Sequence, residues 1–290
     1  MAVKRFFFFC LFFLFILSGS AQNDEFSVMT FNIRYDNPSD NEFSWANRKG
    51  MVFSVLEEYK PEIIGFQEAL KGQVDQIREF LKGYQKEGVA RDDGKESGEY
   101  SVIFYDSARF VRKDGGTFWL SETPDIPGTK SWNAACNRIV TWIELFDKKE
   151  NKSLFVFNTH FDHISEQARI ESAKLILNRI SRIAGKETVI LTGDFNSTDT
   201  SMSYRILTDP SSVNPLIDTR KIAGRNAYGP TYTFGGFPFK PVENEMIDFI
   251  FLSKKSPLGV LQNRVIDYHV KDKYPSDHLP VQTKFTYYKN

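Results

Sequence analysis

The sequence has little cysteine and no excess of charge of either sign. Two cysteines among 290 residues are too few for a scaffold held together by several disulfides. The 37 basic and 37 acidic side chains balance, which gives no electrostatic reason to expect a protein that coats nucleic acid. Because 41% of the residues are hydrophobic, the chain is too apolar to be intrinsically disordered. The fold must therefore rest on a hydrophobic core.

Several catalytic signatures are missing as well. The sequence contains no Gly-x-Ser-x-Gly nucleophile elbow, no Walker loop and no dinucleotide-binding glycine pattern, and no internal repeat or linker follows residue 21. His160 and His163 leave a zinc hydrolase open as an alternative. However, the chain has only 4 histidines and lacks the His-x-His motif of metallo-β-lactamases. The chemistry therefore has to come from other residues.

Residues 1–21 have the layout of a secretory signal peptide. Lys4 and Arg5 precede an apolar run of twelve residues, and small residues follow up to Ala21. The run is shorter than the roughly 20 residues that span a bilayer. We therefore expect cleavage near Ala21, export to the periplasm or the extracellular space, and no transmembrane segment in the mature chain. Cleavage would leave a slightly acidic protein with Cys136 as its single cysteine.

Residues 22–290 show no domain boundary, and we expect them to form one domain. Alternating or continuous apolar runs predict nine strands, and helical spacing of apolar residues predicts three helices. So many strands with so few helices do not fit a Rossmann sheet or a TIM barrel, and they favour two face-to-face sheets with helices outside. The predicted strands cover 26–33, 62–67, 100–105, 138–146, 154–160, 187–193, 246–252, 262–270 and 280–286, and the predicted helices cover 47–58, 71–82 and 165–184.

Carboxylates, amides and imidazoles occur at the ends of these apolar strands. Taken singly, such residues are common in turns. Asp248 is harder to explain in that way, because a carboxylate between Ile247 and Phe249 is costly unless it is paired or bound to a cation. Together the residues supply two imidazoles and the hard oxygen ligands that suit Mg²⁺ or Mn²⁺. The set consists of Asn32, Glu68, His160, Asp194, Asn196, Asp248, Asp277 and His278.

Six short motifs that contain these residues follow one another across nearly the whole mature chain. They are Thr30-Phe31-Asn32-Ile33-Arg34, Gln67-Glu68, Asn158-Thr159-His160, Gly193-Asp194-Phe195-Asn196, Ile247-Asp248-Phe249-Ile250 and Ser276-Asp277-His278-Leu279-Pro280. Together they resemble the signatures of the endonuclease/exonuclease/phosphatase superfamily, whose fold is DNase I-like. The segments 100–105 and 118–121 resemble an exported bacterial subgroup whose substrates are mostly unassigned. This resemblance implies an α/β four-layer sandwich, in which two mixed β-sheets face each other between helices, with the active site at one rim.

The resemblance also implies a metal site. Asn32 and Glu68 would hold Mg²⁺, or Mn²⁺ in its place, and Asp277 would complete the ligand set. These residue types suit the ion, since Mg²⁺ binds through few carboxylates and keeps several of its waters.

The remaining residues would carry out the catalytic steps that the resemblance implies. Asp194 and Asn196 would orient and deprotonate the attacking water. His278, paired with Asp248, and His160 would contact the scissile phosphate and stabilise its developing charge. Which of the two histidines protonates the leaving group stays open. In-line hydrolysis of a phosphate ester needs this combination of cation, activated water and proton donor.

Arg138 and three long polar loops are further candidates. Arg138 resembles an arginine that reaches substrate phosphate in relatives, and a surface cation at a strand end is the alternative. The loops cover 88–99, 121–137 and 222–245. Long loops on a rigid scaffold often carry function. The many aromatic residues of 222–245 would stack on a substrate or pack against the core.

The sequence thus predicts an exported, Mg²⁺-dependent phosphoesterase that uses a metal-activated water in line, in the first place a phosphodiesterase. A nuclease on DNA or RNA is the alternative within this class. A catalytically idle binding protein on the same fold is the alternative of another class, although none of the six motifs is broken. The expected partner is a phosphate-ester substrate, and we expect a monomer.

Overall fold

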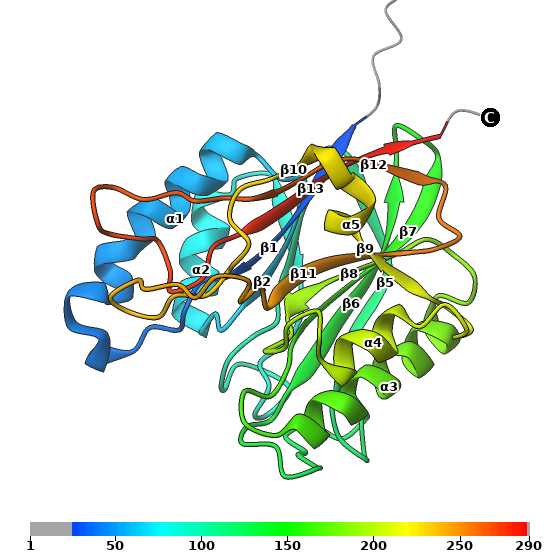
Figure 1. The fold of residues 1–290 in the computed structure, drawn as a ribbon, viewed down its shortest axis with the longest axis horizontal. Coiled ribbons are helices and arrows are strands. Elements are labelled where there is room, and N and C mark those ends of the chain that lie inside the picture. The colour runs from blue at the N-terminus through cyan, green and yellow to red at the C-terminus, as the bar shows by residue number, and fades with distance from the viewer. Residues whose placement is uncertain (1–24, 289–290) are drawn as a thin grey trace, which may run out of the picture.

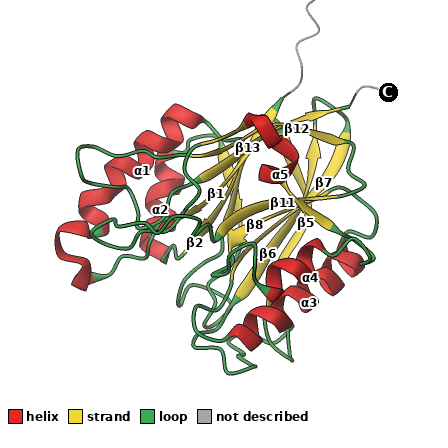
Figure 2. Cartoon of the chain, viewed as in Figure 1, coloured by secondary structure: helices red, strands yellow, loops and turns green. Residues whose placement is uncertain are grey.

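Two mixed β-sheets pack face to face in the computed structural model, which describes residues 25–288 (Figures 1 and 2). The predicted signal peptide at 1–21 lies outside the described residues. The first sheet has the strand order β10 (Ala227–Tyr228), β12 (Leu258–Val265), β13 (Val281–Tyr287), β1 (Phe26–Asn32), β2 (Ile63–Gln67), β4 (Ile103–Asp106) and β3 (Tyr84–Glu87). The second sheet has the order β5 (Phe110–Trp119), β6 (Ile139–Asp147), β7 (Lys152–His160), β8 (Val189–Asp194), β11 (Asp248–Ser253) and β9 (Leu216–Asp218).

Helices cover the outer face of each sheet. The helices α1 (Trp45–Tyr59) and α2 (Lys71–Phe80) pack on the first sheet, and α3 (Glu166–Ile183) and α4 (Met202–Thr208) pack on the second (Figure 1). The short helix α5 (Thr219–Ala223) and the 3₁₀ turns η1 (Pro38–Phe43) and η2 (Gly224–Asn226) lie in connections. No helix within residues 25–288 is long and apolar enough to cross a membrane. The four layers confirm the α/β sandwich that the sequence predicts.

The core follows from the alternation of side chains along the strands. In β1, Val28 points into the layer between the two sheets, where it joins Ile190 and Ile250 of the second sheet. Its neighbour Met29 points to the opposite face and packs in a cluster with Val55 of α1. Successive side chains of a strand point to opposite faces, so a strand that is buried on both faces has to be apolar throughout.

The predicted strands and helices match the structure in type and order more closely than in number or in their ends. Each of the nine predicted strands overlaps an observed strand, and the three predicted helices correspond to α1, α2 and α3. The strand predicted at 262–270 is β12, which lies at Leu258–Val265 instead. A register shift between Val260 and Gln262 interrupts the alternation on which the prediction depends.

The prediction missed β5 because the centre of this strand is polar. Residues between Phe110 and Trp119 are largely exposed and include Gly115 and Gly116, as expected for a strand at the edge of a sheet. The short strands β3, β9 and β10 and the helices α4 and α5 were also missed. The hydrophobic patterns in these segments are too short to be recognised.

Candidate active site

The predicted site lies where the carboxyl ends of four strands meet. The strands β1 and β2 are parallel, with Asn32 opposite Gln67, so Asn32 and Glu68 end up side by side. In the second sheet, Asp194 is in register with His160 on one side and Asp248 on the other. Because β1 packs against β8, these two groups of residues face each other across the sandwich. The register of the strands thus assembles the site.

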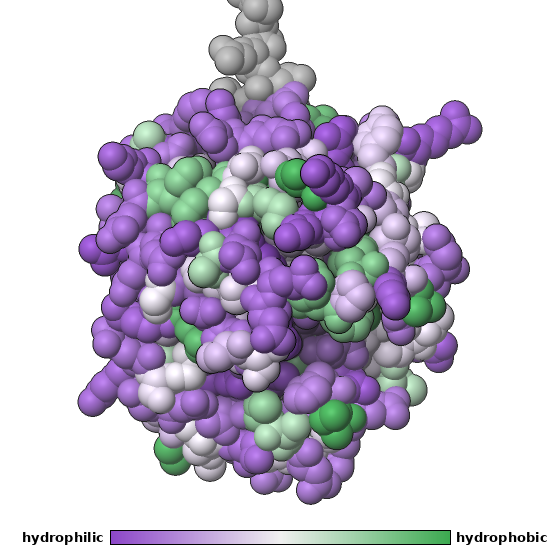
Figure 3. Space-filling view, turned by 90° about the vertical axis from the view of Figure 1, so that its left-hand side faces the viewer, coloured by the Kyte–Doolittle hydropathy of each residue, from purple (hydrophilic) through white to green (hydrophobic). Residues whose placement is uncertain are grey.

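Most of the predicted residues line a single cavity. Seven of the nine line a cavity of about 440 Å³, and the other two, Asn32 and Asp248, lie behind it with 0% and 1% of their surface exposed. The face in Figure 3 is hollowed near its centre, and mainly hydrophilic residues surround the hollow. Residues outside the predicted site also line the cavity: Arg34, Tyr35, Arg91, Glu99, Cys136, His163 and Phe234.

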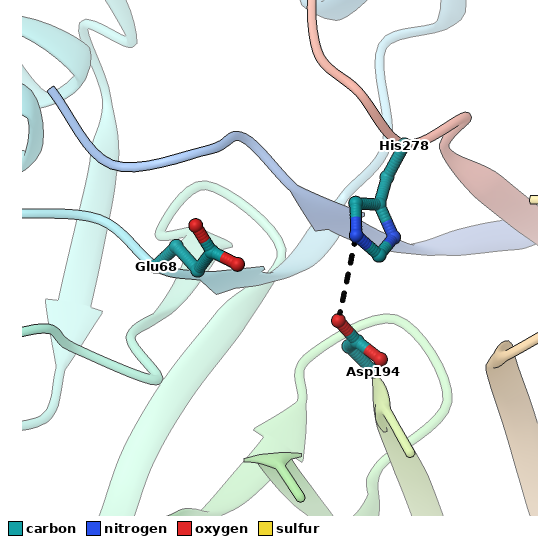
Figure 4. Close-up of side chains that lie close together, drawn as sticks. All are labelled: Glu68, Asp194 and His278. Atoms are coloured by element: carbon teal, nitrogen blue, oxygen red, sulfur yellow. Dashed lines mark ion pairs between the residues drawn. The ribbon is translucent and has the colours of Figure 1, made fainter. Parts of the chain in front are cut away.

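One end of the cavity, which we call the acidic end, brings carboxylates together with an imidazole. Glu68, Asp194 and His278 each offer a ligand atom, and these atoms lie within 4.8 Å of one another (Figure 4). The amide nitrogen of Asn32 donates to Oε1 of Glu68 at 3.0 Å and to Oδ2 of Asp194 at 2.9 Å. The group has the donor atoms and the spacing of a site for a divalent cation.

The predicted ligands Asn32 and Asp277 lie next to this group rather than within it. The amide oxygen of Asn32 accepts the backbone N–H of Arg34 at 3.0 Å, so its nitrogen faces the carboxylates. Oδ2 of Asp277 lies 4.0 Å from Nε of Arg34 at the wall of the same cavity. In this arrangement Asn32 fixes the positions of Glu68 and Asp194. A direct bond from Asn32 or Asp277 to a metal stays a prediction.

Backbone strain marks two of the site residues. Glu68 has a φ of 63° and Asn196 a φ of 45°, in the left-handed region that non-glycine residues rarely adopt. Such conformations cost about 1–3 kcal/mol and persist where the surrounding structure holds them. The backbone N–H of Asn196 donates to Oδ1 of Asp194 at 2.9 Å, which ties this turn to the carboxylate. Two of the residues that rarely populated backbone conformations affect thus lie at or beside the acidic end of the cavity.

His278 is held in its protonated form by two carboxylates. Its Nδ1 is 2.9 Å from Oδ2 of Asp248, and its Nε2 is 3.7 Å from Oδ2 of Asp194. Burial alone would lower the pKa of His278, but the charges of Asp248 and Asp194 outweigh it and raise the pKa well above its usual value. Burial, with the charge of Asp248, raises the pKa of Asp194 to about 7. A carboxylate with a pKa near neutrality suits a general base.

His160 is in the opposite state. Burial, together with the positive charges of Arg138 and Arg91, lowers its pKa well below the usual value. Its Nε2 is 3.0 Å from the amide nitrogen of Asn196, which donates to it, so the ring proton sits on Nδ1. That Nδ1 has no hydrogen-bond partner among residues 25–288, and Oε2 of Glu99 is 4.0 Å away. The site thus pairs a charged imidazole with a neutral one.

The other end of the cavity, which we call the arginine end, contains Arg138 and Arg91. Arg138 is only 4% exposed, so it is not the surface cation that the sequence left open. Nη2 of Arg138 lies 3.0 Å from Nδ1 of His163. His163 therefore contacts a guanidinium group rather than the candidate metal site. Nη1 of Arg91 donates to Oε2 of Glu99 at 2.6 Å, and burial raises the pKa of this carboxyl.

The aromatic residues mostly pack within the protein. The indole N–H of Trp119 donates to the carbonyl of Arg91 at 2.6 Å, and the ring is 4% exposed. In the loop 222–245, Phe237 stacks on Phe43 with 4.7 Å between ring centres, and Phe239 packs against the core. Phe234 is the aromatic residue of this loop that lines the cavity. The only sign of Arg91 and Glu99 in the sequence is the polarity of the loop 88–99.

The fold and the site define a class of protein. Carboxylates, a charged and a neutral imidazole, and buried guanidinium groups line one cavity. This combination of groups suits the hydrolysis of phosphate esters. The family model described as the Endonuclease/Exonuclease/phosphatase family matches residues 29–278. The chain therefore belongs to this family of phosphoester hydrolases, as its motifs led us to expect.

Solved structures of bacterial proteins resemble this chain over nearly its whole length. An endonuclease/exonuclease/phosphatase from Bacteroides vulgatus is 38% identical, with a TM-score of 0.85, and the match covers 91% of this chain and 99% of that one. A mannosyl-6-phosphatase from Bacteroides thetaiotaomicron is 34% identical, with a TM-score of 0.83, and the match covers 90% and 100%. Among curated proteins, an uncharacterized protein of Acanthamoeba polyphaga mimivirus is 26% identical over 82% of this chain and 91% of its own length.

Proposed function

We propose that the protein is a divalent-cation-dependent phosphoesterase that hydrolyses phosphate esters of small molecules with water. The observation that carries this proposal is the group formed by Glu68, Asp194 and His278, whose ligand atoms lie within 4.8 Å of one another at one end of a 440 Å³ cavity. The volume lies within the range of small-molecule sites. It argues for a compact substrate rather than a long stretch of polymer.

The donor set fits Mg²⁺, with Mn²⁺ as a substitute. Glu68 would hold the ion, with Asp194 at its side, and Asn32 keeps both carboxylates in place through its amide nitrogen. When bound, the cation would polarise the phosphoryl oxygens and lower the pKa of a bound water. Carboxylate oxygens are ligands that suit Mg²⁺ better than Zn²⁺, so the zinc alternative has less support.

The protein's own residues divide the remaining steps. Asp194, with its pKa of about 7, would accept the proton of the attacking water, and Asn196 would orient that water. His278 carries a proton and would stabilise the charge on phosphate or donate to the leaving oxygen. This assignment favours His278 over His160 as the general acid, because burial and neighbouring arginines keep His160 neutral.

Substrates of two kinds compete within this proposal. The likeness to a mannosyl-6-phosphatase, at 34% identity over 90% of the chain, supports a phosphorylated sugar. A nuclease remains the second candidate, because the family's own description includes endonucleases and exonucleases. The catalytically idle alternative has the least support, since the cavity retains its carboxylates and both predicted imidazoles.

A metal-dependent assay tests the proposal. We expect purified protein to release phosphate from sugar phosphates or nitrophenol from p-nitrophenyl phosphate with Mg²⁺ or Mn²⁺, and to lose this activity in EDTA. Glu68→Gln should abolish turnover, whereas the exposed residue Glu79 provides a control in Glu79→Gln. Absence of turnover on nitrophenyl, sugar, nucleotide and nucleic-acid phosphates with every cation would support the idle binding protein instead.

Export and a monomeric state remain predictions from the sequence. Cell fractionation and N-terminal sequencing should find a mature chain that begins near residue 22 outside the cytoplasm. Light scattering after gel filtration should give the mass of one chain. Retention in the cytoplasm with residues 1–21 intact would contradict export.

A further inference from the structure

The arginine end of the cavity lies beside the acidic end in the order of the strands. The acidic end is built on β13, β1 and β2 of one sheet and on β7, β8 and β11 of the other. Arg91 and Glu99 belong to the loop that leads into β4, the neighbour of β2, and Arg138 immediately precedes β6, the neighbour of β7. His160 lies between the two ends, 3.4 Å from Asp194 on one side and 4.0 Å from Glu99 on the other.

Guanidinium groups at this end have hydrogen-bond donors to spare. Nε and Nη1 of Arg138 and Nε of Arg91 are buried and have no hydrogen-bond partner within residues 25–288. Oδ2 of Asp162 lies 3.8 Å from Nε of Arg138, and Oδ1 of Asp92 lies 3.8 Å from Nε of Arg91, so both are beyond hydrogen-bond distance. A buried donor without a partner costs about 1–3 kcal/mol, so such donors indicate a missing ligand. Guanidinium groups bind phosphate oxygens through paired N–H donors.

The side of the arginine end that faces away from the main cavity is closed. Arg138 is 4% exposed, Ser101 is 3% and Ile139 is 2%. The crevice behind them, which His160 and Glu99 also line, has a volume of about 10 Å³. That volume is at the lower limit for one water molecule. Oxygen atoms of a phosphate in the main cavity can face this wall, but a carbon substituent on one of them cannot extend past the wall into the crevice.

From these observations, and on the basis of the proposed phosphoesterase function, we propose that Arg91 and Arg138 make the enzyme selective for phosphate monoesters. A monoester phosphate presents three non-bridging oxygens and up to two negative charges. A diester presents two such oxygens and one charge, and its second ester arm needs an exit. In-line attack places the water and the leaving oxygen on opposite sides of phosphorus, so the other three oxygens lie in the plane between them, where one can face the cation and another the arginine end. This proposal replaces the phosphodiesterase that the sequence favoured with a phosphatase.

The test uses two substrates that differ by one methyl group, p-nitrophenyl phosphate and methyl p-nitrophenyl phosphate. Both release nitrophenol, so kcat/KM is measured in the same way for each with Mg²⁺ present. We expect the wild-type enzyme to prefer the monoester by at least about tenfold, because charge-assisted contacts to the additional oxygen are lost in the diester. Equal rates on the two esters, or a preference for the diester, would overturn the proposal.

Variants then assign the preference to the two arginines. Arg91→Gln and Arg138→Gln should each lower kcat/KM for the monoester by about tenfold or more, and by a larger factor than for the diester. Arg112, exposed and paired with Glu87 outside the cavity, provides the matched control Arg112→Gln, which should behave as wild type. Arg138→Lys should restore part of the preference, because it keeps the charge. An equal loss of kcat/KM for both esters, in variants that retain the wild-type Tm, would contradict the proposal. It would mean that the arginines do not recognise the additional oxygen of the monoester.

Two further results distinguish this proposal from binding of a second anionic group and from failure of the proposed function. Inorganic phosphate should inhibit the wild-type enzyme more strongly than Arg91→Gln, as expected if Arg91 contacts the phosphate. If the arginines instead bind a second anionic group, a hexose bisphosphate would be preferred over a hexose 6-phosphate, and Arg91→Gln would remove that preference, which would contradict the proposal. Failure to hydrolyse any phosphate ester would contradict the proposed function itself, whereas turnover without selectivity would contradict only this inference.

Discussion

The two ends of the cavity are built from different parts of the fold, and they suit different ligands. At the acidic end, residues that follow strands hold one another: Asn32 binds Glu68 and Asp194, and Asp248 binds His278. At the arginine end, loops carry the residues, and buried guanidinium nitrogens are left without partners among the described residues. A preorganised cluster suits a cation and a water that must be placed accurately. Unpaired guanidinium donors suit a negatively charged ligand, which brings the acceptor atoms that these donors lack.

This comparison predicts its largest effects at the acidic end. Glu68→Ala and Asp194→Ala should each lower kcat by about 10³-fold or more, since one removes a metal ligand and the other the base. The Tm should stay close to that of the wild type in Glu68→Ala, and it should stay close or rise in Asp194→Ala, because burial and the charge of Asp248 disfavour the ionised form of Asp194. The rate and a thermal melt measure both. Turnover within a few-fold of wild type in either variant would contradict the assignment.

Asp248→Asn probes the charged imidazole without touching the cavity wall. Asp248 raises the pKa of His278, so the neutral amide should lower that pKa and reduce kcat by about 10²-fold. A proton donor works only below its own pKa, so the alkaline limb of the pH–rate profile should move to lower pH. An unchanged alkaline limb would show that His278 does not supply the proton.

Metal binding should depend on one end only. With Mg²⁺ at about 100 times its Kd, the wild-type protein should gain about 2.7 kcal/mol of unfolding free energy, seen as a rise in Tm. Arg138→Gln should keep this rise, and Glu68→Gln should lose it. Loss of the rise in both variants would mean that the two ends do not act separately.

We expect the smallest effect from a change at Trp119, which supports Arg91 at the arginine end of the cavity. Trp119→Phe removes the hydrogen bond from the indole to the carbonyl of Arg91, which is worth about 1 kcal/mol. Loosening Arg91 should raise KM for a monoester about fivefold and leave kcat nearly unchanged. Steady-state kinetics give both values. A fall in kcat with constant KM would place the role of Trp119 elsewhere.

The sequence could predict the residues at strand ends better than those carried by loops. Asp194 and His160 end apolar strands, so the period-two pattern located them and the parallel pairing of β7 and β8 brought them together. Arg91 and Glu99 lie in a loop whose path depends on distant contacts. At Gly94, with a φ of 68°, a Cβ would lie 3.0 Å from Pro127 and 3.2 Å from the ring of Trp119. No local pattern encodes such an approach between loops.

Protonation states were also beyond the sequence. The motifs name His160 and His278 but do not distinguish them, because the difference comes from their neighbours in space. Two carboxylates keep His278 charged, and two arginines with burial keep His160 neutral. Of these neighbours, the sequence suggested only Asp248 as a partner, through the resemblance.

The most direct test of the two-ended cavity is a crystal structure with Mn²⁺ and inorganic phosphate, in which anomalous scattering locates the metal. We predict Mn²⁺ at about 2.0–2.2 Å from a carboxylate oxygen of Glu68, with the phosphate between the metal and the guanidinium of Arg138. Mn²⁺ bound away from Glu68, or a phosphate that makes no contact with Arg138, would contradict the account.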